Sequence, residues 1–228
     1  MLENGRLMLV DAGGESVENY CTDHTRTYPV SGKFTDRQRD IYNIVLAAHQ
    51  QSPANMKAGA MYMEDVHRKA LLILAEGLRG VGLINGSAED AVAAGAMYLF
   101  MPHGLSHGMG IDVHDCEAIG ERSYDFSAIA ERAAQEATCV HRATWRLRAG
   151  TVMSNEPGIY FIPALIDKSR SEGLYRGIVN YDKLDSYRDF GGIRIEDDVI
   201  VTERGGVVIG GDKKIPVTVE ELEAVVGK

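Results

Sequence analysis

Cysteine is scarce in this chain and gives no sign of a covalent or cysteine-metal framework. The three cysteines, Cys21, Cys116 and Cys139, are widely spaced and odd in number, and no two of them form a CxxC pair. This pattern argues against a disulfide-stapled fold and against a cysteine zinc site. It is typical of a protein from a reducing compartment, so we expect a cytoplasmic location.

Long apolar runs and an excess of basic residues are also missing. No stretch approaches the ~20 apolar residues that a membrane-spanning helix requires. The N-terminal segment carries Glu3 and only a short apolar run, unlike a signal peptide. With 33 acidic and 24 basic residues, the net charge is −9, which provides no basic patch for nucleic acid or for a membrane surface. The sequence therefore predicts a soluble protein with neither of these partners.

The composition that is present is that of an ordinary globular protein. The chain has 228 residues, of which 45% are hydrophobic and 25% are charged. This length and composition suffice for a substantial buried core. We find no repeat, low-complexity segment or interdomain linker, and therefore predict a single α+β domain over residues 1–228.

The first elements are expected to form a β-hairpin. Residues 6–12 are a short apolar run that ends at a pair of glycines, and residues 20–30 are rich in tyrosine and threonine. Such runs on either side of a glycine turn are typical of paired strands. The pairing would place Asp11 on one strand and Asp23 on the other.

Helices are predicted from capping signals and apolar spacing. Thr35 and Gln38 match a capping box, and apolar residues follow at helical spacing, which predicts a helix of some fifteen residues from Asp36. Further expected elements are helices over 61–78, 87–99 and 218–226, helix or loop over 125–141, and strands over 151–155, 193–195 continuing through 199–202, and 207–209.

Three histidines lie close together in the run FMPHGLSHGMGIDVHD, residues 100–115. His103, His107 and His114 are separated by glycines and apolar residues, so the run is not a solvated charge cluster. Histidine is both a common metal ligand and the usual proton carrier near neutral pH. The run therefore indicates a functional site, although by itself it does not identify the reaction.

Four acidic residues accompany the histidines, each in a strand-like segment or beside a glycine turn: Asp11, Asp23, Glu156 and Glu196. Converging carboxylates would repel one another unless cations compensate them. An oxygen-rich set with one imidazole suits Mn²⁺ and can also take Co²⁺ or Zn²⁺.

Each of these acidic residues also has a purely structural explanation. Asp11 and Asp23 could form turns, Glu156 could end a strand before Pro157, and Glu196 lies in an acidic triplet typical of a solvated edge. Spacing alone leaves both interpretations open.

Five motifs carry a resemblance to a known family: VDAGGE, TDHTRTYPVSGKFT, HGLSHGMGIDVHD, NEPGIYFIP and GGIRIEDDVIVT. In this order they closely resemble the metallopeptidase family of prolidase and aminopeptidase P, over essentially the whole chain. The resemblance implies the pita-bread fold that this family shares with methionine aminopeptidase and creatinase. It also implies a hydrolase that cleaves the peptide bond before proline.

The resemblance implies two divalent ions per chain, most readily Mn²⁺, held by five side chains. Asp11 would bind one ion, Asp23 and Glu196 would bridge both, and His107 and Glu156 would complete the second.

The resemblance also assigns substrate-side roles. Glu156 would transfer the proton from water to the leaving nitrogen, and His114 would donate to the scissile carbonyl or its oxyanion. His103 would shape the proline pocket, and Arg194 would hold substrate or neighbouring carboxylates, since alternation along a strand places it on the same face as Glu196. The other histidines match no such role and are interpreted as surface or structural residues: His24, His49, His67 and His141.

The role of Arg142 decides whether the expected substrates are dipeptides or longer peptides. It lies fourteen residues before Glu156, where prolidase-like relatives carry an arginine for the free proline carboxylate. We therefore expect Xaa-Pro dipeptides as substrates. The alternatives are a surface arginine in a basic stretch with Arg146 and Arg148, and an Xaa-Pro aminopeptidase that acts on longer peptides.

The first motif begins at Val10, whereas family members usually carry an N-terminal domain and further elements before it. We expect a truncated catalytic domain that lacks the opening elements of its first half and completes its core as a homo-oligomer or with a partner chain. A non-catalytic interaction protein is the alternative from another class. Creatinase-like chemistry is less favoured, because creatinase works without a metal and all five ligand positions are present here.

Overall fold

The expected N-terminal hairpin forms, but its turn lies between Glu15 and Cys21 and not at Gly13 and Gly14, which are inside the first strand. The computed structural model describes residues 1–115, 143 and 145–227, and it begins with β1 (Leu7–Glu15) paired antiparallel to β2 (Cys21–Pro29). Asp11 is paired with Thr25 and Gly13 with Asp23, so the two aspartates lie two positions apart on one face. A side chain at Gly13 would meet the Thr22 carbonyl oxygen at 2.1 Å, so this close strand pairing requires glycine.

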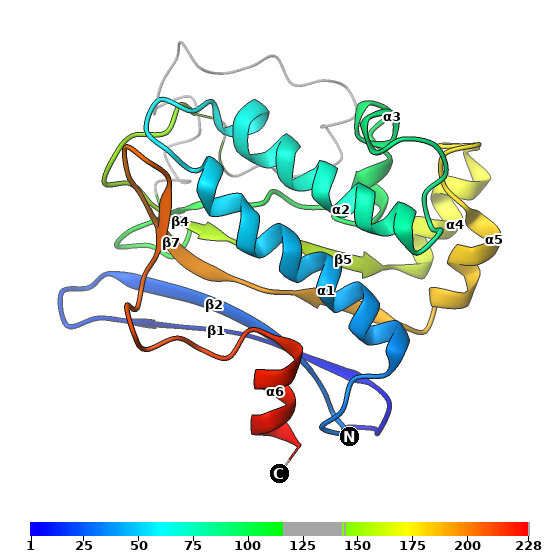
Figure 1. Cartoon of the computed structure of the whole chain (residues 1–228), viewed down its shortest axis with the longest axis horizontal. Helices are drawn as coiled ribbons and strands as arrows, with labels where there is room; N and C mark the ends of the chain where they lie inside the picture. The colour runs from blue at the N-terminus through cyan, green and yellow to red at the C-terminus, as the bar shows by residue number, and fades with distance from the viewer. Residues whose placement is uncertain (116–142, 144, 228) are drawn as a thin grey trace.

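Helix α1 (Asp36–Gln51) begins at the predicted residue. Thr35 and Gln38 form the complete capping box, which satisfies backbone N–H groups at the start of the helix. Its buried face includes Ile41, Ile44 and Val45, at the spacing seen in the sequence. Figure 1 shows α1 beside α2 (Arg68–Gly80), above the β1–β2 hairpin. The short 3₁₀ helix η1 (Ser52–Asn55) follows α1.

Two other expected helices are interrupted. The helix predicted over 61–78 consists of a π-helical turn, η2 (Tyr62–His67), followed by α2. The helix predicted over 87–99 consists of α3 (Ala88–Ala93) and a 3₁₀ turn, η3 (Ala96–Leu99). Gly95 separates these two with φ of 74°, a left-handed conformation that ends a helix.

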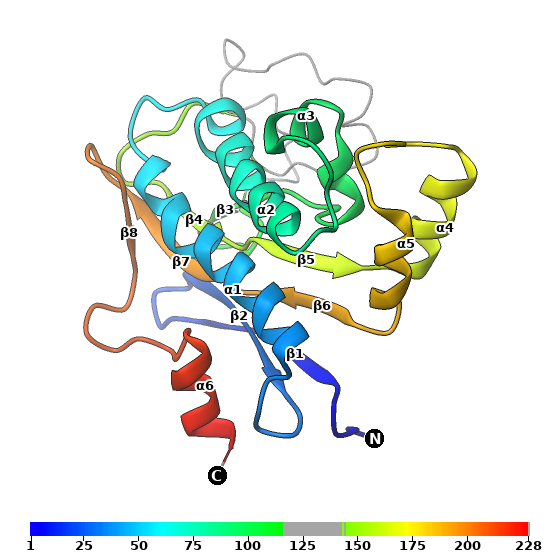
Figure 2. The ribbon, with the colours of Figure 1, turned by 45° about the vertical axis from the view of Figure 1, so that its right-hand side comes forward.

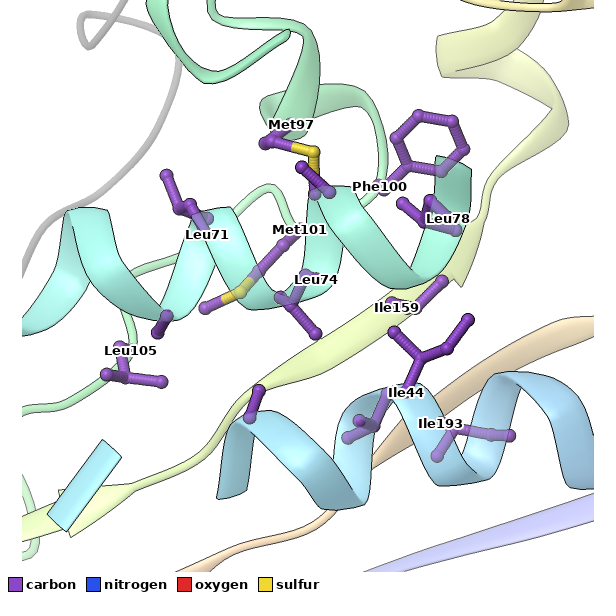
Figure 3. Packing of buried hydrophobic residues seen from close by; sticks show 14 of the residues in the cluster. Ile44, Leu71, Leu74, Leu78, Met97, Phe100, Met101, Leu105, Ile159 and Ile193 are labelled. Carbon is purple, nitrogen blue, oxygen red and sulfur yellow. The ribbon is translucent and has the colours of Figure 1, made fainter. Parts of the chain in front are cut away.

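The hydrophobic core lies between the two long helices and the strands. Figure 3 shows Leu71, Leu74 and Leu78 of α2 in one buried cluster with Ile44 of α1 and Ile159 of the sheet. Leu74, Leu78 and Ile159 have no solvent exposure. This packing gives a rigid support on which the neighbouring polar side chains can be aimed.

The remaining strands form two small antiparallel sheets. One has the order β3 (Gly108–Met109), β4 (Val152–Asn155), β7 (Asp197–Val201) and β8 (Gly206–Val208). The other pairs β5 (Gly158–Phe161) with β6 (Gly191–Arg194). The expectation of one continuous strand from 193 to 202 was wrong, because the chain passes from one sheet to the other at Ile195 and Glu196.

Several elements were not predicted. They are β5, α4 (Pro163–Ser171), α5 (Tyr181–Leu184) and η7 (Asp185–Tyr187), and Figure 2 shows α4 and α5 together at one end of the molecule. The last helix, α6 (Val219–Val226), has the predicted capping box between Thr218 and Glu221. Within the described ranges, no helix has both the length and the apolar character needed to cross a membrane. The expectation for 125–141 lies outside the described residues.

Candidate metal centre

Eight of the nine residues that the sequence singled out line one cavity of about 430 Å³. They come from separate parts of the fold: Asp11, Asp23, His103, His107, His114, Glu156, Arg194 and Glu196. Arg142, the ninth, lies outside the described residues. The tertiary structure thus brings together side chains that are spread over almost the whole chain.

The hairpin contributes Asp11 and Asp23. Arg194, at the end of β6, donates from Nη2 to Oδ2 of Asp11. The Asp11 side chain is 51% exposed, whereas Asp23 is nearly buried. The neighbouring His107 ring lowers the pKa of Asp23, and partial burial raises the pKa of Asp11. The two aspartates therefore differ in their readiness to ionise.

His107 lies at the centre of the carboxylates. Its Nδ1 is 3.1 Å from the Gly108 carbonyl oxygen, which can only accept, so Nδ1 carries a proton. Its Nε2 is 3.5 Å from Oδ2 of Asp23, 3.5 Å from Oε1 of Glu156 and 3.9 Å from Oε1 of Glu196. In the neutral ring, the lone pair of Nε2 therefore faces three carboxylates.

Hydrogen bonds orient Glu156 at the end of β4. The Ser154 hydroxyl accepts from the His107 backbone N–H at 2.9 Å and donates to Oε1 of Glu156 at 3.2 Å. The Glu156 backbone N–H donates to the Leu105 carbonyl at 2.9 Å. Burial and the charge of Glu196 raise the pKa of Glu156 to about 8.

Glu196 is held between the hairpin and the sheet. The Thr25 hydroxyl donates to Oε2 of Glu196 at 2.6 Å, and Arg194 Nε lies 3.5 Å from the same oxygen. Burial raises the pKa of Glu196 to about 7, despite the hydrogen bond from Thr25. Arg194 and Glu196 both line the cavity, although the predicted strand that would carry both of them ends at Arg194.

The expectation that an acidic triplet would form a solvated edge is wrong for residues 196–198. Glu196, Asp197 and Asp198 are 2%, 8% and 3% exposed, respectively. Asp197 accepts two hydrogen bonds from Arg26, and its carboxylate lies 3.0 Å from Nε2 of His49. Buried carboxylates persist because such partners compensate them. His49 is accordingly a structural residue and not a surface one.

Tyr160 is a cavity residue that the sequence reasoning missed. Its hydroxyl accepts from Arg194 Nη1 at 3.1 Å and lies 3.0 Å from His103 Nε2. His103 Nδ1 lies 2.7 Å from the Gly104 carbonyl and must donate to it, so Nε2 of the neutral ring accepts a hydrogen bond from the Tyr160 hydroxyl. Tyr160 lies within the NEPGIYFIP motif, which was the available signal.

His114 lies beside His107 at the cavity wall. The two rings meet edge to face with their centroids 4.3 Å apart. A nitrogen of His114 also belongs to one of three groups of donor atoms that lie within 4.8 Å of one another, together with Asp23 and His107. This position suits both a substrate-side donor and a group adjacent to a metal.

The donor set fits divalent cations. The other two groups within 4.8 Å are His107, Glu156 and Glu196, and Asp11, Asp23 and Glu196. Asp23, Glu196 and His107 are each shared between two groups, so the three groups adjoin one another. Clustered carboxylates facing an imidazole lone pair repel one another without positive charge. The chemistry of these residues therefore suits metal ions.

Comparison with known proteins decides the family. The family model described as metallopeptidase family M24 matches residues 1–203. The chain belongs to metallopeptidase family M24. The human Xaa-Pro dipeptidase is 38% identical over 225 residues, which cover 98% of this chain and 43% of the human protein. A probable Xaa-Pro aminopeptidase from Paracoccidioides lutzii is 37% identical and covers 94% of this chain and 44% of its own length.

Solved structures support the M24 fold. A variant of Escherichia coli aminopeptidase P matches with a TM-score of 0.71 and 31% identity, over 99% of this chain and 42% of that protein. The Pseudomonas aeruginosa aminopeptidase matches with a TM-score of 0.70 and 30% identity, over 97% of this chain and 41% of that protein. The predicted mixed α and β pita-bread fold is confirmed. This M24 chain spans about two fifths of the length of these relatives.

Proposed function

We propose that this M24 chain is a two-metal hydrolase that cleaves the peptide bond before proline, with Xaa-Pro dipeptides as its main substrates. The observation that carries the proposal is the convergence of three carboxylates on Nε2 of His107, with Asp11 lining the same cavity. Its similarity to an Xaa-Pro dipeptidase and to Xaa-Pro aminopeptidases supports the substrate class.

Five side chains would hold the ions: Asp11, Asp23, His107, Glu156 and Glu196. When bound, two divalent ions supply charge that lowers the pKa of water and polarises a carbonyl group. The preference for oxygen donors favours Mn²⁺, with Co²⁺ and Zn²⁺ as alternatives.

Glu156 is the residue proposed to transfer the proton to the leaving nitrogen. In the metal-free chain, burial and the neighbouring Glu196 raise its pKa to about 8, so this carboxylate holds a proton more readily than an ordinary glutamate does. The nitrogen of an Xaa-Pro bond carries no N–H and must receive this proton for the bond to break. His103, whose Nδ1 lies 3.7 Å from Oε2 of Glu156, is positioned on the same side of the cavity.

The substrate carbonyl and the proline ring would be met by the remaining lining residues. His114 is proposed as the donor to the oxyanion, a role in which a placed hydrogen bond stabilises the transition state. Arg194 and Tyr160 are hydrogen-bonded to each other, so they present a fixed polar wall beside His103. A cavity of about 430 Å³ suits a small ligand such as a dipeptide.

The test combines a metal titration with cleavage of Ala-Pro and of a longer peptide with proline second. We expect about two Mn²⁺ per chain and faster cleavage of Ala-Pro. The variant His107→Ala should lose both properties, whereas His67→Ala, outside the cavity, controls for removal of a buried histidine. Binding of Mn²⁺ without hydrolysis would favour a non-catalytic interaction protein, and preference for the longer peptide would favour an aminopeptidase.

Three further expectations remain predictions from the sequence. They are the cytoplasmic location, the single catalytic domain over residues 1–228, and association with a second copy or a partner chain. Sedimentation at several protein concentrations measures the last of these.

A further inference from the structure

Arg26 of β2 donates hydrogen bonds from all three nitrogens of its guanidinium group. The residue is 7% exposed, although arginine is rarely buried without partners. Nε donates to the Pro216 carbonyl at 2.7 Å, and Nη2 donates to Asp197 at 2.8 Å and to the Ile215 carbonyl at 3.3 Å. The remaining nitrogen, Nη1, makes the contacts that matter for the centre.

Nη1 of Arg26 donates to two backbone carbonyls at once. These are the carbonyls of Thr25, at 2.9 Å, and Glu196, at 2.8 Å. The same two residues form an isolated antiparallel bridge, in which each backbone N–H donates to the other carbonyl, at 3.3 and 3.0 Å. The guanidinium therefore holds both sides of the backbone bridge between Thr25 of β2 and Glu196, the residue before β7.

This bridge sets the separation of two proposed metal ligands. Asp23 lies two residues before Thr25 on β2, and Glu196 is itself a member of the bridge. The Thr25 side chain also orients the Glu196 carboxylate. Because the two carboxylates repel each other, they would move apart unless the backbone beneath them were held.

We propose that Arg26 is a positioning residue for the metal centre, an inference that rests on the proposed function. By tying the Thr25 and Glu196 carbonyls together and anchoring them to Asp197 and to the segment at 215–216, it fixes Asp23 and Glu196 at the spacing that shared ions require. Arg26 does not line the cavity of the candidate centre. It therefore acts on Asp23 and Glu196 through the backbone carbonyls that it holds.

Arginine is required because of its geometry. The planar guanidinium offers five donors in a fixed fork, whereas the lysine ammonium is a single point with three donors. Arg26→Lys therefore keeps the charge opposite Asp197 but cannot span the Thr25 and Glu196 carbonyls and reach Pro216 as well. The variant therefore tests whether the metal centre needs the hydrogen-bonding geometry of Arg26 or only its positive charge.

The experiment measures the Mn²⁺ dissociation constant by titration calorimetry, with circular dichroism and thermal unfolding on each protein. We expect Arg26→Lys to raise the dissociation constant by about 10- to 100-fold, the usual effect of losing a group that orients metal ligands. The matched control is Arg39→Lys, because Arg39 also joins distant segments through Glu223 but lies away from the centre. The control should keep the wild-type dissociation constant.

If Arg26→Lys folds poorly, the variant Asp197→Asn and the electron paramagnetic resonance spectrum of bound Mn²⁺ provide a second test. Asp197→Asn leaves every backbone contact of Arg26 in place, and we expect it to weaken Mn²⁺ binding by a smaller factor. The electron paramagnetic resonance spectrum of the Mn²⁺ form should change in Arg26→Lys and not in Arg39→Lys. A folded Arg26→Lys with wild-type affinity and spectrum would overturn this inference alone. A wild-type chain without Mn²⁺ affinity would overturn the proposed function and this inference with it.

Discussion

The metal-free chain should lose stability as the pH rises from about 5 to about 8, because Glu156 is buried beside Glu196. These surroundings raise the pKa of Glu156 from 4.5 to about 8 in the folded state. An unfolded glutamate ionises near its ordinary value, so across this range the unfolded chain releases a proton that the native chain retains. The contribution is fully present below the unfolded pKa and is lost as the pH rises through the folded pKa.

The expected loss is large enough to measure. Each pKa unit between the two states is worth about 1.4 kcal/mol, so complete ionisation of Glu156 costs about 4 to 5 kcal/mol of unfolding free energy. That amount is a substantial part of the total stability of a typical domain, which is about 5 to 15 kcal/mol. Neighbouring groups also titrate, so the comparison with a variant isolates the effect of Glu156.

Urea unfolding with a chelator present, at several pH values, measures this effect. Glu156→Gln removes the ionisable group and should make the decline less steep, whereas the exposed Glu172→Gln should follow the wild type. Added Mn²⁺ should stabilise the wild type most at the alkaline end, because only the ionised carboxylate binds metal. Glu156→Gln should gain much less from Mn²⁺.

Two results would refute this reasoning. A wild-type stability that stays level or rises between about pH 5 and pH 8, with chelator present, would mean that Glu156 is not held neutral by burial. An equal gain from Mn²⁺ in the wild type and in Glu156→Gln would contradict the proposed role of Glu156 as a ligand.

Four further changes have defined outcomes. Arg142→Ala should raise KM for Xaa-Pro dipeptides in peptidase assays and spare longer peptides, and an equal effect on both would contradict its role. Tyr160→Phe removes the hydroxyl between Arg194 and His103 and should lower kcat by about 10-fold or more with the Mn²⁺ content unchanged, as metal analysis would verify. Thr35→Ala should cost about 1 kcal/mol in urea unfolding, because it removes the side chain that caps α1. Leu74→Ala should cost about 2 to 5 kcal/mol in the same assay, since Leu74 is fully buried between the helices and the sheet.

Local signals in the sequence predicted the elements with complete capping or turn chemistry. The capping boxes at Thr35 and Thr218 gave the correct starts of α1 and α6. The two strand-like runs gave the hairpin, but the glycine pair at 13–14 was wrongly taken as its turn, because both glycines lie inside β1. Where no such signal existed, the prediction failed. Apolar spacing does not distinguish a π-helical turn from an α-helix, so η2 was merged with α2.

The candidate site was predicted residue by residue through motif resemblance, and not through spacing. Asp11 and its partner Arg194 are 183 residues apart, and Thr25 and Glu196 are 171 apart. No local rule relates residues at such separations. The resemblance nevertheless omitted Tyr160 and Arg26, whose roles depend on contacts with other segments.

The sequence by itself determined which side chains could form the centre, because the motifs and the clustered histidines are properties of short segments. Only the tertiary structure decided that these side chains face one another and that residues 196–198 are buried. The physical reason is that burial, carboxylate repulsion and the clamp made by Arg26 depend on distances between strands. Those distances exist only once β2, β4 and β7 have packed together.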